Sequence, residues 1–293
     1  MNIVLTVLEI VAPVFLLGAI GFAWVKLGFE YRIQFITKLA MTLAIPALIF
    51  TALMETKIEP AALTAISVAA IVSYVAISVV MAAFVALTGL DRRTYLAPAI
   101  FGNTGNIGLP LALFAFGDEG LGFAVVVFAV MSVFAFTFGV WLVSGGGSLR
   151  RVVQEPMVAA TLLGVLFLWQ GWQTPVFLTN ALSLIGQMAI PLMLITLGVA
   201  VARLTPGRIG RAVWVSLAKA VICVGIAWAV GRWFELGPVA FAVLVLQVAT
   251  PVAVASYLLA EKYGADGDAV AGLVVISTLL SIALIPVLLG FVI

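Results

Sequence analysis

The sequence has no histidine, a single cysteine and few charged residues. Without histidine, imidazole proton relays and histidine-ligated metal sites are excluded. The one cysteine, Cys223, cannot form a disulfide within the chain and lies in an apolar run, so no thiol chemistry is expected. Only 9% of the 293 residues are charged and 65% are hydrophobic, whereas about 25% of a typical soluble domain is charged. The composition therefore indicates an integral membrane protein.

Catalytic and cofactor motifs are also missing. The glycines Gly102, Gly105 and Gly108 recur at a spacing of three, but they lie inside an apolar run and do not open a nucleotide-binding loop. The sequence contains no metal-ligand spacing and no nucleophile–base pair. We expect a protein that is not an enzyme, with no metal site, no cofactor and no nucleic-acid partner.

Apolar segments recur along the chain at the length of about 20 residues that a helix needs to cross a bilayer. This pattern predicts an all-α, multi-pass membrane protein with ten transmembrane helices. They are expected at residues 3–25, 33–54, 61–88, 95–116, 120–143, 156–172, 176–202, 209–231, 238–260 and 269–292.

The distribution of lysine and arginine predicts the orientation of these helices. Eleven of the 14 cations lie in or beside the connections that follow odd-numbered helices, and two, Lys57 and Arg232, lie on the other side. Connections rich in lysine and arginine stay in the cytoplasm. Both termini are therefore expected on the periplasmic side of a bacterial inner membrane.

The chain also repeats itself. The sequence Ala44-Ile45-Pro46 recurs as Ala189-Ile190-Pro191, and Pro110 recurs as Pro251. Each unit holds five helices, an odd number, so the second copy must enter the membrane from the opposite side. A 5+5 inverted repeat is predicted, with a pseudo-two-fold axis in the membrane plane. Its parts would be a first repeat at 1–143, a cytoplasmic linker at 144–155 and a second repeat at 156–293.

Two of the predicted helices are interrupted. The stretch Phe101–Pro110 holds three glycines and a proline, and the stretch Gln247–Pro251 ends in a proline. Because proline lacks an N–H and clashes with the preceding turn, the first helix should break or kink near Asn106. Freed backbone groups persist in a membrane only inside protein or beside a wet cavity. Paired interruptions at matching repeat positions are typical of a transporter's binding site.

The breaks suggest an anion site. Half-helices that begin at Pro110 and Pro251 would point their positive N-terminal ends inward, toward an anionic group such as a carboxylate. The alternative is that small and polar residues serve only helix packing; two breaks at equivalent positions favour the site. The expected substrate-binding residues are Asn103, Thr104, Asn106, Gln247 and Thr250, with crossover backbone from Gly105, Gly108, Pro110 and Pro251.

Two charged residues inside predicted helices are candidates for charge coupling. Glu9 lies early in the first helix, where an intramembrane acid is a functional candidate, although a place near the outer interface explains it equally well. Lys219 lies in the eighth helix and either contacts substrate or a carboxylate, or extends its amine toward the interface.

Nearly the whole chain resembles the auxin efflux carrier family, bacterial permeases related to the plant PIN-type auxin exporters. The resemblance is carried by an N-T-x3-G-x-P-L pattern, by an L-Q-x3-P stretch with a following A-E-K-Y, and more weakly by P-x-L in helix two. These patterns comprise Asn103, Thr104, Gly108, Pro110 and Leu111, then Leu246, Gln247, Pro251 and 260–263, then Pro46 and Leu48.

The resemblance implies a ten-helix fold shared with bile-acid symporters and sodium/proton antiporters, in which helices 4 and 9 are broken and cross. Helices 1, 2, 6 and 7 would form a scaffold and a homodimer contact. Helices 3–5 and 8–10 would form a moving transport domain. Asn103 matches the asparagine expected to contact a substrate carboxylate. Sodium-coupled relatives place an acid in the second crossover, and residues 244–259 contain none.

From the residues and the resemblance together, we expect a secondary transporter of small organic anions, mono- or dicarboxylates, that works by an elevator-type mechanism in the lipid bilayer. One alternative is a symporter coupled to Na⁺ or H⁺ that carries a bulkier amphipathic acid. Another is a receptor or channel-like pore that does not transport as a carrier.

Overall fold

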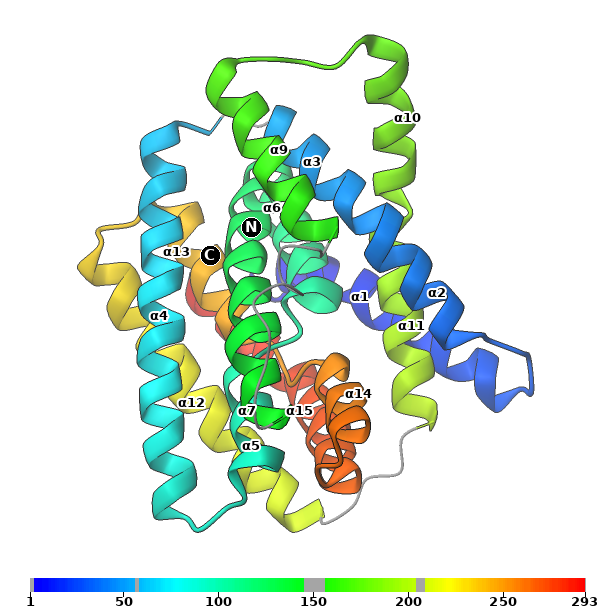
Figure 1. Ribbon diagram of the computed structural model, residues 1–293, viewed down its shortest axis with the longest axis vertical. Helices are drawn as coiled ribbons and strands as arrows, with labels where there is room; N and C mark the ends of the chain where they lie inside the picture. Colours follow the sequence, from blue (N-terminus) through cyan, green and yellow to red (C-terminus); the bar gives the residue numbers. More distant parts are fainter. Residues whose placement is uncertain (1–2, 56–57, 145–155, 204–208, 293) are drawn as a thin grey trace.

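A computed structural model describes residues 3–55, 58–144, 156–203 and 209–292 (Figure 1). The described part is almost entirely helical and contains no strand, as expected for an all-α membrane protein. Most of the predicted linker, from residue 145 to 155, lies outside it. Within the described ranges, six helical segments are long and apolar enough to cross a membrane: Ile33–Glu55, Pro60–Leu87, Thr104–Ser144 (which reverses direction at Gly117), Val176–Arg203, Ile209–Trp233 and Gly267–Val292.

The helices follow one another with short connections. The first half contains α1 (Ile3–Lys26), α2 (Ile33–Leu39), η1 (Ala40–Ala44), α3 (Ile45–Glu55), α4 (Pro60–Leu87), α5 (Arg92–Ile100), η2 (Thr104–Gly108), α6 (Leu109–Phe134), η3 (Ala135–Gly139) and α7 (Val140–Ser144). The second half contains α9 (Pro156–Gln170), α10 (Val176–Gln187), α11 (Ala189–Arg203), α12 (Ile209–Trp233), α13 (Pro238–Val248), α14 (Val254–Tyr263) and α15 (Gly267–Val292).

Two of the prolines inside helices follow a wider, π-helical turn. The π turn η1 ends just before Ile45 and Pro46, and η2 ends just before Leu109 and Pro110. A proline ring in a regular α-helix clashes with the carbonyl four residues earlier. The π turn changes the position of that carbonyl, so the helix continues through the proline.

The segment labelled α6 is a hairpin of two antiparallel helices, because Gly117 interrupts it. Gly117 has φ 63° and ψ −151°, a backbone conformation that is essentially limited to glycine. Beyond it, Gly120 packs on Ala112 and Phe116, and Phe128 packs on Gly105. Contacts between residues so far apart in sequence require the chain to reverse at Gly117. The hairpin carries η2 at one end and the turn at the other.

Helix caps and side-chain contacts fix one end of the bundle, at the bottom of Figure 1. Asp91 accepts a hydrogen bond from Thr94 N–H at the start of α5, and Asp266 accepts one from Ala269 N–H at the start of α15. Arg93 then joins separate elements by donating to the carbonyls of Val143, at 3.1 Å, and Tyr263, at 2.8 Å. The N-terminal end of α5 and the C-terminal ends of α7 and α14 therefore lie together.

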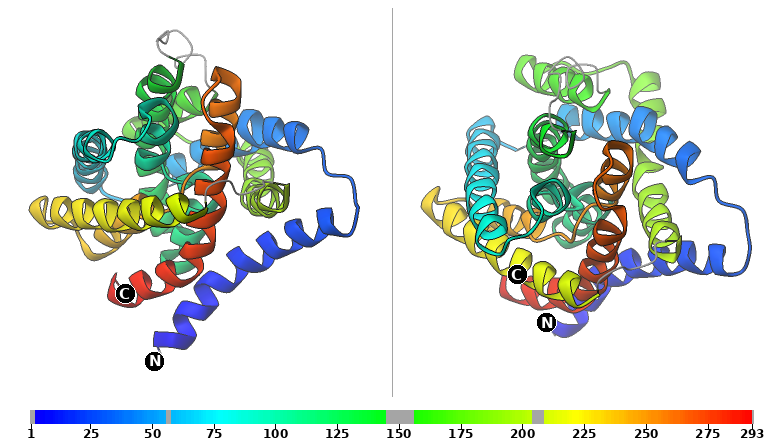
Figure 2. Two further views of the ribbon diagram at one scale, coloured as in Figure 1. Left: turned by 90° about the horizontal axis from the view of Figure 1, so that it is seen from below. Right: turned by 60° about the horizontal axis from the view of Figure 1, so that its bottom comes forward.

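The helices pack in two groups. In one group α1 packs along α11, and α3 packs against α9 and α10; in the other, α12 packs against α4, α13 and α15, and α13 packs against α6. Viewed from below, α2 and α11 lie on one side of α15, and α4 and α12 lie on the other (Figure 2). Contacts of α6 with α1 and α3, and of α11 with η2, join the two groups.

We predict that Gly117→Ala destabilises the hairpin by about 1–3 kcal/mol, because a Cβ strains the backbone conformation at this turn. The midpoint of thermal unfolding of the purified protein in detergent measures the effect. Gly225→Ala is the matched control, since Gly225 lies inside α12 and a Cβ there would meet no atom within 4 Å. An equal midpoint for both variants would contradict the assigned turn.

Candidate functional site

The two interrupted helices meet in the centre of the molecule. Between α5 and η2 the chain is extended at residues 101–103, and between α13 and α14 it leaves the helix at residues 249–253. The two segments form an antiparallel bridge between Gly102 and Val252, and the N–H of Asn103 donates to the carbonyl of Pro251 at 2.7 Å. We call this pair of segments the crossover. It joins parts of the chain that are about 150 residues apart in sequence.

Side chains also satisfy the opened backbone of the crossover. The N–H of Val252 donates to Ser277 Oγ at 3.0 Å, and Thr250 Oγ1 donates to the carbonyl of Gln247 at 2.7 Å. A Cβ on Gly102 would overlap Thr250, so the close approach of the two segments requires glycine there. Buried backbone groups in an apolar interior are costly without such partners.

Asn103 lies at the start of the helix that follows the first break. Its carbonyl accepts hydrogen bonds from the N–H groups of Ile107 and Gly108. Its side chain is only 4% exposed, and Nδ2 has no hydrogen-bond partner among the described residues. An unpaired buried amide costs about 1–3 kcal/mol, so a ligand that accepts from Nδ2 would remove this cost.

Asn103 lines a cavity of about 650 Å³, and we call it the crossover cavity. The helix starts at Thr104 and Val254 both border it, through Gly105 and Asn106 on one side and residues 253–256 on the other. No described group accepts the backbone N–H of Thr104, Gly105 or Asn106. Free N–H groups and positive helix ends suit an anion. The wall also contains Phe101, Phe128 and Met131, which gives most of the lining an apolar character.

The opposite side of the crossover holds a buried cation. Lys219, on α12, is 3% exposed, and its Nζ donates to the carbonyl of Ala99 in the last turn of α5 at 3.3 Å. Nζ also lies 3.9 Å from Cys223 Sγ, and no described carboxylate lies within ion-pair distance. Lys219 and the end of α13 border a space of about 20 Å³, which Thr250 and Pro251 also line. The lysine therefore lies at the negative, C-terminal ends of both broken helices.

The remaining polar residues expected at the site are buried away from the cavity. Thr104 and Gln247 are fully buried, and neither lines the crossover cavity. Gln247 Nε2 is 3.5 Å from the carbonyl of Ala124, and the Gln247 side chain packs directly on Gly108. Thr250 faces Lys219 instead. The structure thus brings Asn103 and Asn106 to the cavity and uses Gln247 and Thr250 within the crossover.

The position of the first break differs from the prediction. The helix opens at residues 101–103 and not near Asn106, and the new half-helices begin at Thr104 and Val254, not at Pro110 and Pro251. Pro110 is buried one turn inside the helix, where the π turn η2 accommodates its ring. Pro251 lies in the extended part of the second break and supplies its carbonyl to Asn103.

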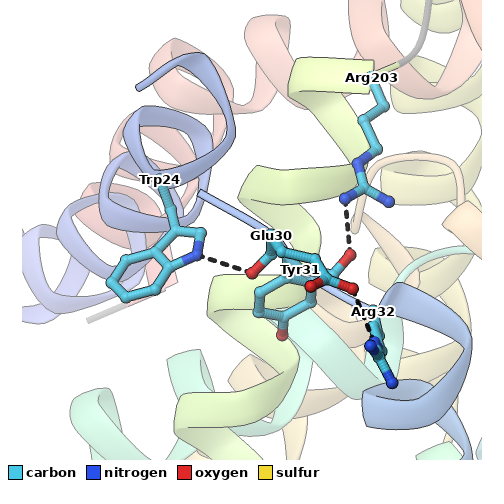
Figure 3. Close-up of polar contacts among 5 residues, drawn as sticks. All are labelled: Trp24, Glu30, Tyr31, Arg32 and Arg203. Carbon is cyan, nitrogen blue, oxygen red and sulfur yellow. Dashed lines mark hydrogen bonds and ion pairs between the residues drawn. The ribbon is translucent and has the colours of Figure 1, made fainter. Parts of the chain in front are cut away.

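Glu9 lies on α1 with its side chain exposed, and it borders none of the cavities described here. The connection between α1 and α2, by contrast, lies beside Arg203, which lines the crossover cavity (Figure 3). Arg203 donates to the carbonyl of Tyr31 at 2.6 Å, and the Tyr31 hydroxyl is 2.7 Å from Thr196 Oγ1. Burial raises the pKa of the Tyr31 phenol, while the bond with Thr196 and the charge of Arg203 lower it. Arg203 is therefore held at the cavity by a neutral carbonyl.

A second, larger cavity of about 1110 Å³ lies at the other end of the hairpin, and we call it the tip cavity. It borders the turn of α6 through Asp118 and Glu119, and it borders the ends of α3 and α10 through Glu55 and Gln187. None of the residues of the crossover lines it. The two cavities thus approach the middle of the molecule from opposite ends, and the crossover faces one of them.

Sequence reasoning missed several residues that the structure brings to the site. Ser277, on α15, has no motif around it, and its role depends on the contact with Val252. Lys38 and Arg203 line the crossover cavity, although in the sequence they are part of the basic connections that indicate orientation.

The helical, apolar fold and the paired breaks define a multi-pass membrane protein of the transporter class. The sequence profile of the family described as Membrane transport protein matches residues 6–148 and 140–289. These matches cover nearly the whole chain, so the protein belongs to this family, the auxin efflux carrier family.

Individual relatives agree with the family. A protein of Methanothermobacter thermautotrophicus named "Uncharacterized transporter" is 29% identical over 290 residues, which cover 95% of this chain and 96% of the relative. A Rhizobium meliloti protein named "Putative malonate transporter" is 27% identical over 271 residues, which cover 84% of this chain and 83% of the relative. These names point to a transporter and away from an enzyme.

We predict that Ser277→Ala lowers the midpoint of thermal unfolding by the equivalent of about 1–3 kcal/mol, because the buried N–H of Val252 loses its acceptor. Ser281→Ala is the matched control: Ser281 is buried one turn later in α15, and its hydroxyl only donates to Thr278 within the same helix. If both variants unfold at the same temperature, the bond from Val252 does not stabilise the crossover.

Proposed function

We propose that this protein is a secondary carrier of small organic anions, with the carboxylate bound at the crossover. The observation that supports this proposal most strongly is the unpaired, buried amide of Asn103 beside two helix starts in one cavity. Positive helix ends and neutral donors stabilise an anion when it is bound and bury no bare charge when the site is empty. The relative named for malonate supports mono- or dicarboxylates as the substrate class.

We also propose the ten-helix, 5+5 inverted repeat for the whole chain. It is supported by the reversal at Gly117 and by the pairing of the two breaks, which an axis in the membrane plane would bring together. The group of α1–α3 and α9–α11 would be the scaffold, and the group of α4–α7 and α12–α15 would be the transport domain. Sliding of one group against the other would expose the crossover first to one cavity and then to the other, as in an elevator.

The orientation follows from the positive-inside rule. Arg93 donates to the carbonyl of Val143, which lines the crossover cavity, and Arg203 lines the same cavity. We therefore place the crossover cavity on the cytoplasmic side and the tip cavity on the periplasmic side of a bacterial inner membrane. Both termini would then be periplasmic.

Removal of the Asn103 amide tests the site. We predict that Asn103→Ala raises the KM for malonate at least tenfold, because a hydrogen bond to a charged group contributes about 1.5–3 kcal/mol. Uptake of radiolabelled malonate into proteoliposomes measures it, with the thermal midpoint as a check on folding. Asn180→Ala is the control, since Asn180 is exposed on α10 and lines neither cavity. A folded Asn103→Ala variant with the KM of the wild type would contradict the assignment.

Lys219 argues against sodium coupling. Its ammonium group already occupies the space at the C-terminal ends of α5 and α13, where a coupling cation would otherwise offset the negative helix ends. The proposal is that Lys219 is a permanent counter-charge of the crossover and that transport does not require Na⁺.

We predict that replacing NaCl with choline chloride changes neither the malonate transport rate nor the thermal midpoint of the wild type by more than about twofold or about 1 °C. In Lys219→Ala, Ser216, Ser277 and the carbonyl of Ala99 would surround a space without a cation. Na⁺ should then raise the midpoint of this variant but not that of Lys219→Arg. Sodium-dependent stabilisation of the wild type would favour the symporter alternative.

A further inference from the structure

The crossover cavity contains only positive charges among its described ionisable side chains. Lys38, on α2, and Arg203, at the end of α11, both line it, and no described aspartate or glutamate does. Neither cation lies within ion-pair distance of a described carboxylate, and the guanidinium of Arg203 is held by the neutral carbonyl of Tyr31. Both charges therefore act on the contents of the cavity without local compensation.

The tip cavity has the opposite charge. Four carboxylates line it, and no described lysine or arginine does; they are Glu55, Glu59, Asp118 and Glu119. All four side chains are exposed to solvent. Lys57 lies outside the described residues, but a single cation leaves this end with an excess of carboxylates.

We propose that these opposite charges make the carrier electrostatically asymmetric: anions have a low KM at the crossover cavity and a high KM at the tip cavity. This inference rests on the proposed function and extends it to the kinetic difference between the two sides. Asn103, whose buried amide is unpaired, lines the same cavity as Lys38 and Arg203, so the cations and the proposed binding residue are on the same side of the crossover.

The physical basis is focusing of the field in clefts with apolar walls. A cleft lined by one sign of charge changes the local concentration of an ion by about 10-fold to 1000-fold. An anion is enriched beside Lys38 and Arg203 and is depleted beside the four carboxylates. With no membrane potential, equal concentrations on the two sides must give no net flux, so Vmax/KM is the same in both directions. The side with the lower KM then also has the lower Vmax.

Charged thiol reagents measure the two fields without any assumption about transport. In a Cys223→Ser background, single cysteines are introduced as Thr37→Cys in the crossover cavity and Ser183→Cys in the tip cavity. Each is labelled with an anionic and a cationic methanethiosulfonate reagent, and the ratio of the two rates is divided by the ratio for a free thiol. Both reagents attack the same thiolate, so the effect of the thiol pKa cancels in the ratio of the two labelling rates.

We expect the normalised ratio of anionic to cationic labelling to be about ten or more at Thr37→Cys and about one tenth or less at Ser183→Cys. In 1 M KCl, where the Debye length is about 3 Å, both ratios should approach one. Lys38→Gln with Arg203→Gln should lower the first ratio to within about twofold of one. Arg203→Lys, which keeps the charge, should preserve it. Equal or reversed ratios at the two positions would overturn the proposal.

Transport measured separately from each side of the membrane then tests the predicted difference in KM. The KM for malonate is measured in inverted and right-side-out membrane vesicles with the membrane potential collapsed, and it should be about tenfold lower in the inverted vesicles. Arg92→Gln is the charge control, because Arg92 is exposed at the same end but does not line the cavity; it should leave the KM ratio unchanged. Equal KM values from both sides overturn the inference. If malonate is not transported, the proposed function fails for this acid, and the labelling ratios still decide the asymmetry.

Discussion

The hydrogen bond from the Asn103 N–H to the Pro251 carbonyl, with the bridge between Gly102 and Val252, is the contact on which the rest of the structure depends. An interrupted helix inside a membrane protein leaves backbone groups that neither water nor lipid can satisfy. Here the second break supplies an acceptor for the first, and Ser277 accepts the N–H of Val252. The pairing also determines toward which side of the crossover the half-helices begin and end. The starts of the two following half-helices border the crossover cavity, and the ends of the two preceding ones lie beside Lys219.

This arrangement separates charge across a few residues. Lys219 lies where the helix ends are negative, and an anion would bind where the helix starts are positive, so the crossover can hold both without a buried carboxylate of its own. The charged residues farther from the crossover are also separated by sign. The connections that fix the orientation in the membrane also bring Lys38 and Arg203 to one cavity, and the turns at the other end bring four carboxylates to the opposite one. Under these proposals, residues that in the sequence indicate only orientation would also determine the electrostatic field at the two cavities.

The sequence predicted the helices well where local chemistry ends them. The helix expected at 61–88 is observed at 60–87, and Asp91 and Asp266 cap the helices that follow their turns. Asn103 and Asn106 were predicted at the site because buried amides beside a helix break in a membrane need polar partners, which a binding site provides. The break itself was placed one turn too late, because a π turn absorbs Pro110 and local rules assume a regular helix. Ser277 and the partner of Lys219 could not be predicted, since contacts between distant helices define them.

The central claim is that the crossover binds a small carboxylate. The most direct test is the thermal unfolding of the purified protein in a concentration series of malonate, succinate, malate, indole-3-acetate and taurocholate. Binding to the folded state alone adds RT ln(1 + [L]/Kd), about 2.7 kcal/mol at a hundredfold excess over Kd. The account predicts that at least one small carboxylate raises the midpoint in this saturable way in the absence of sodium. A midpoint that no carboxylate changes, or that only sodium raises, would contradict it.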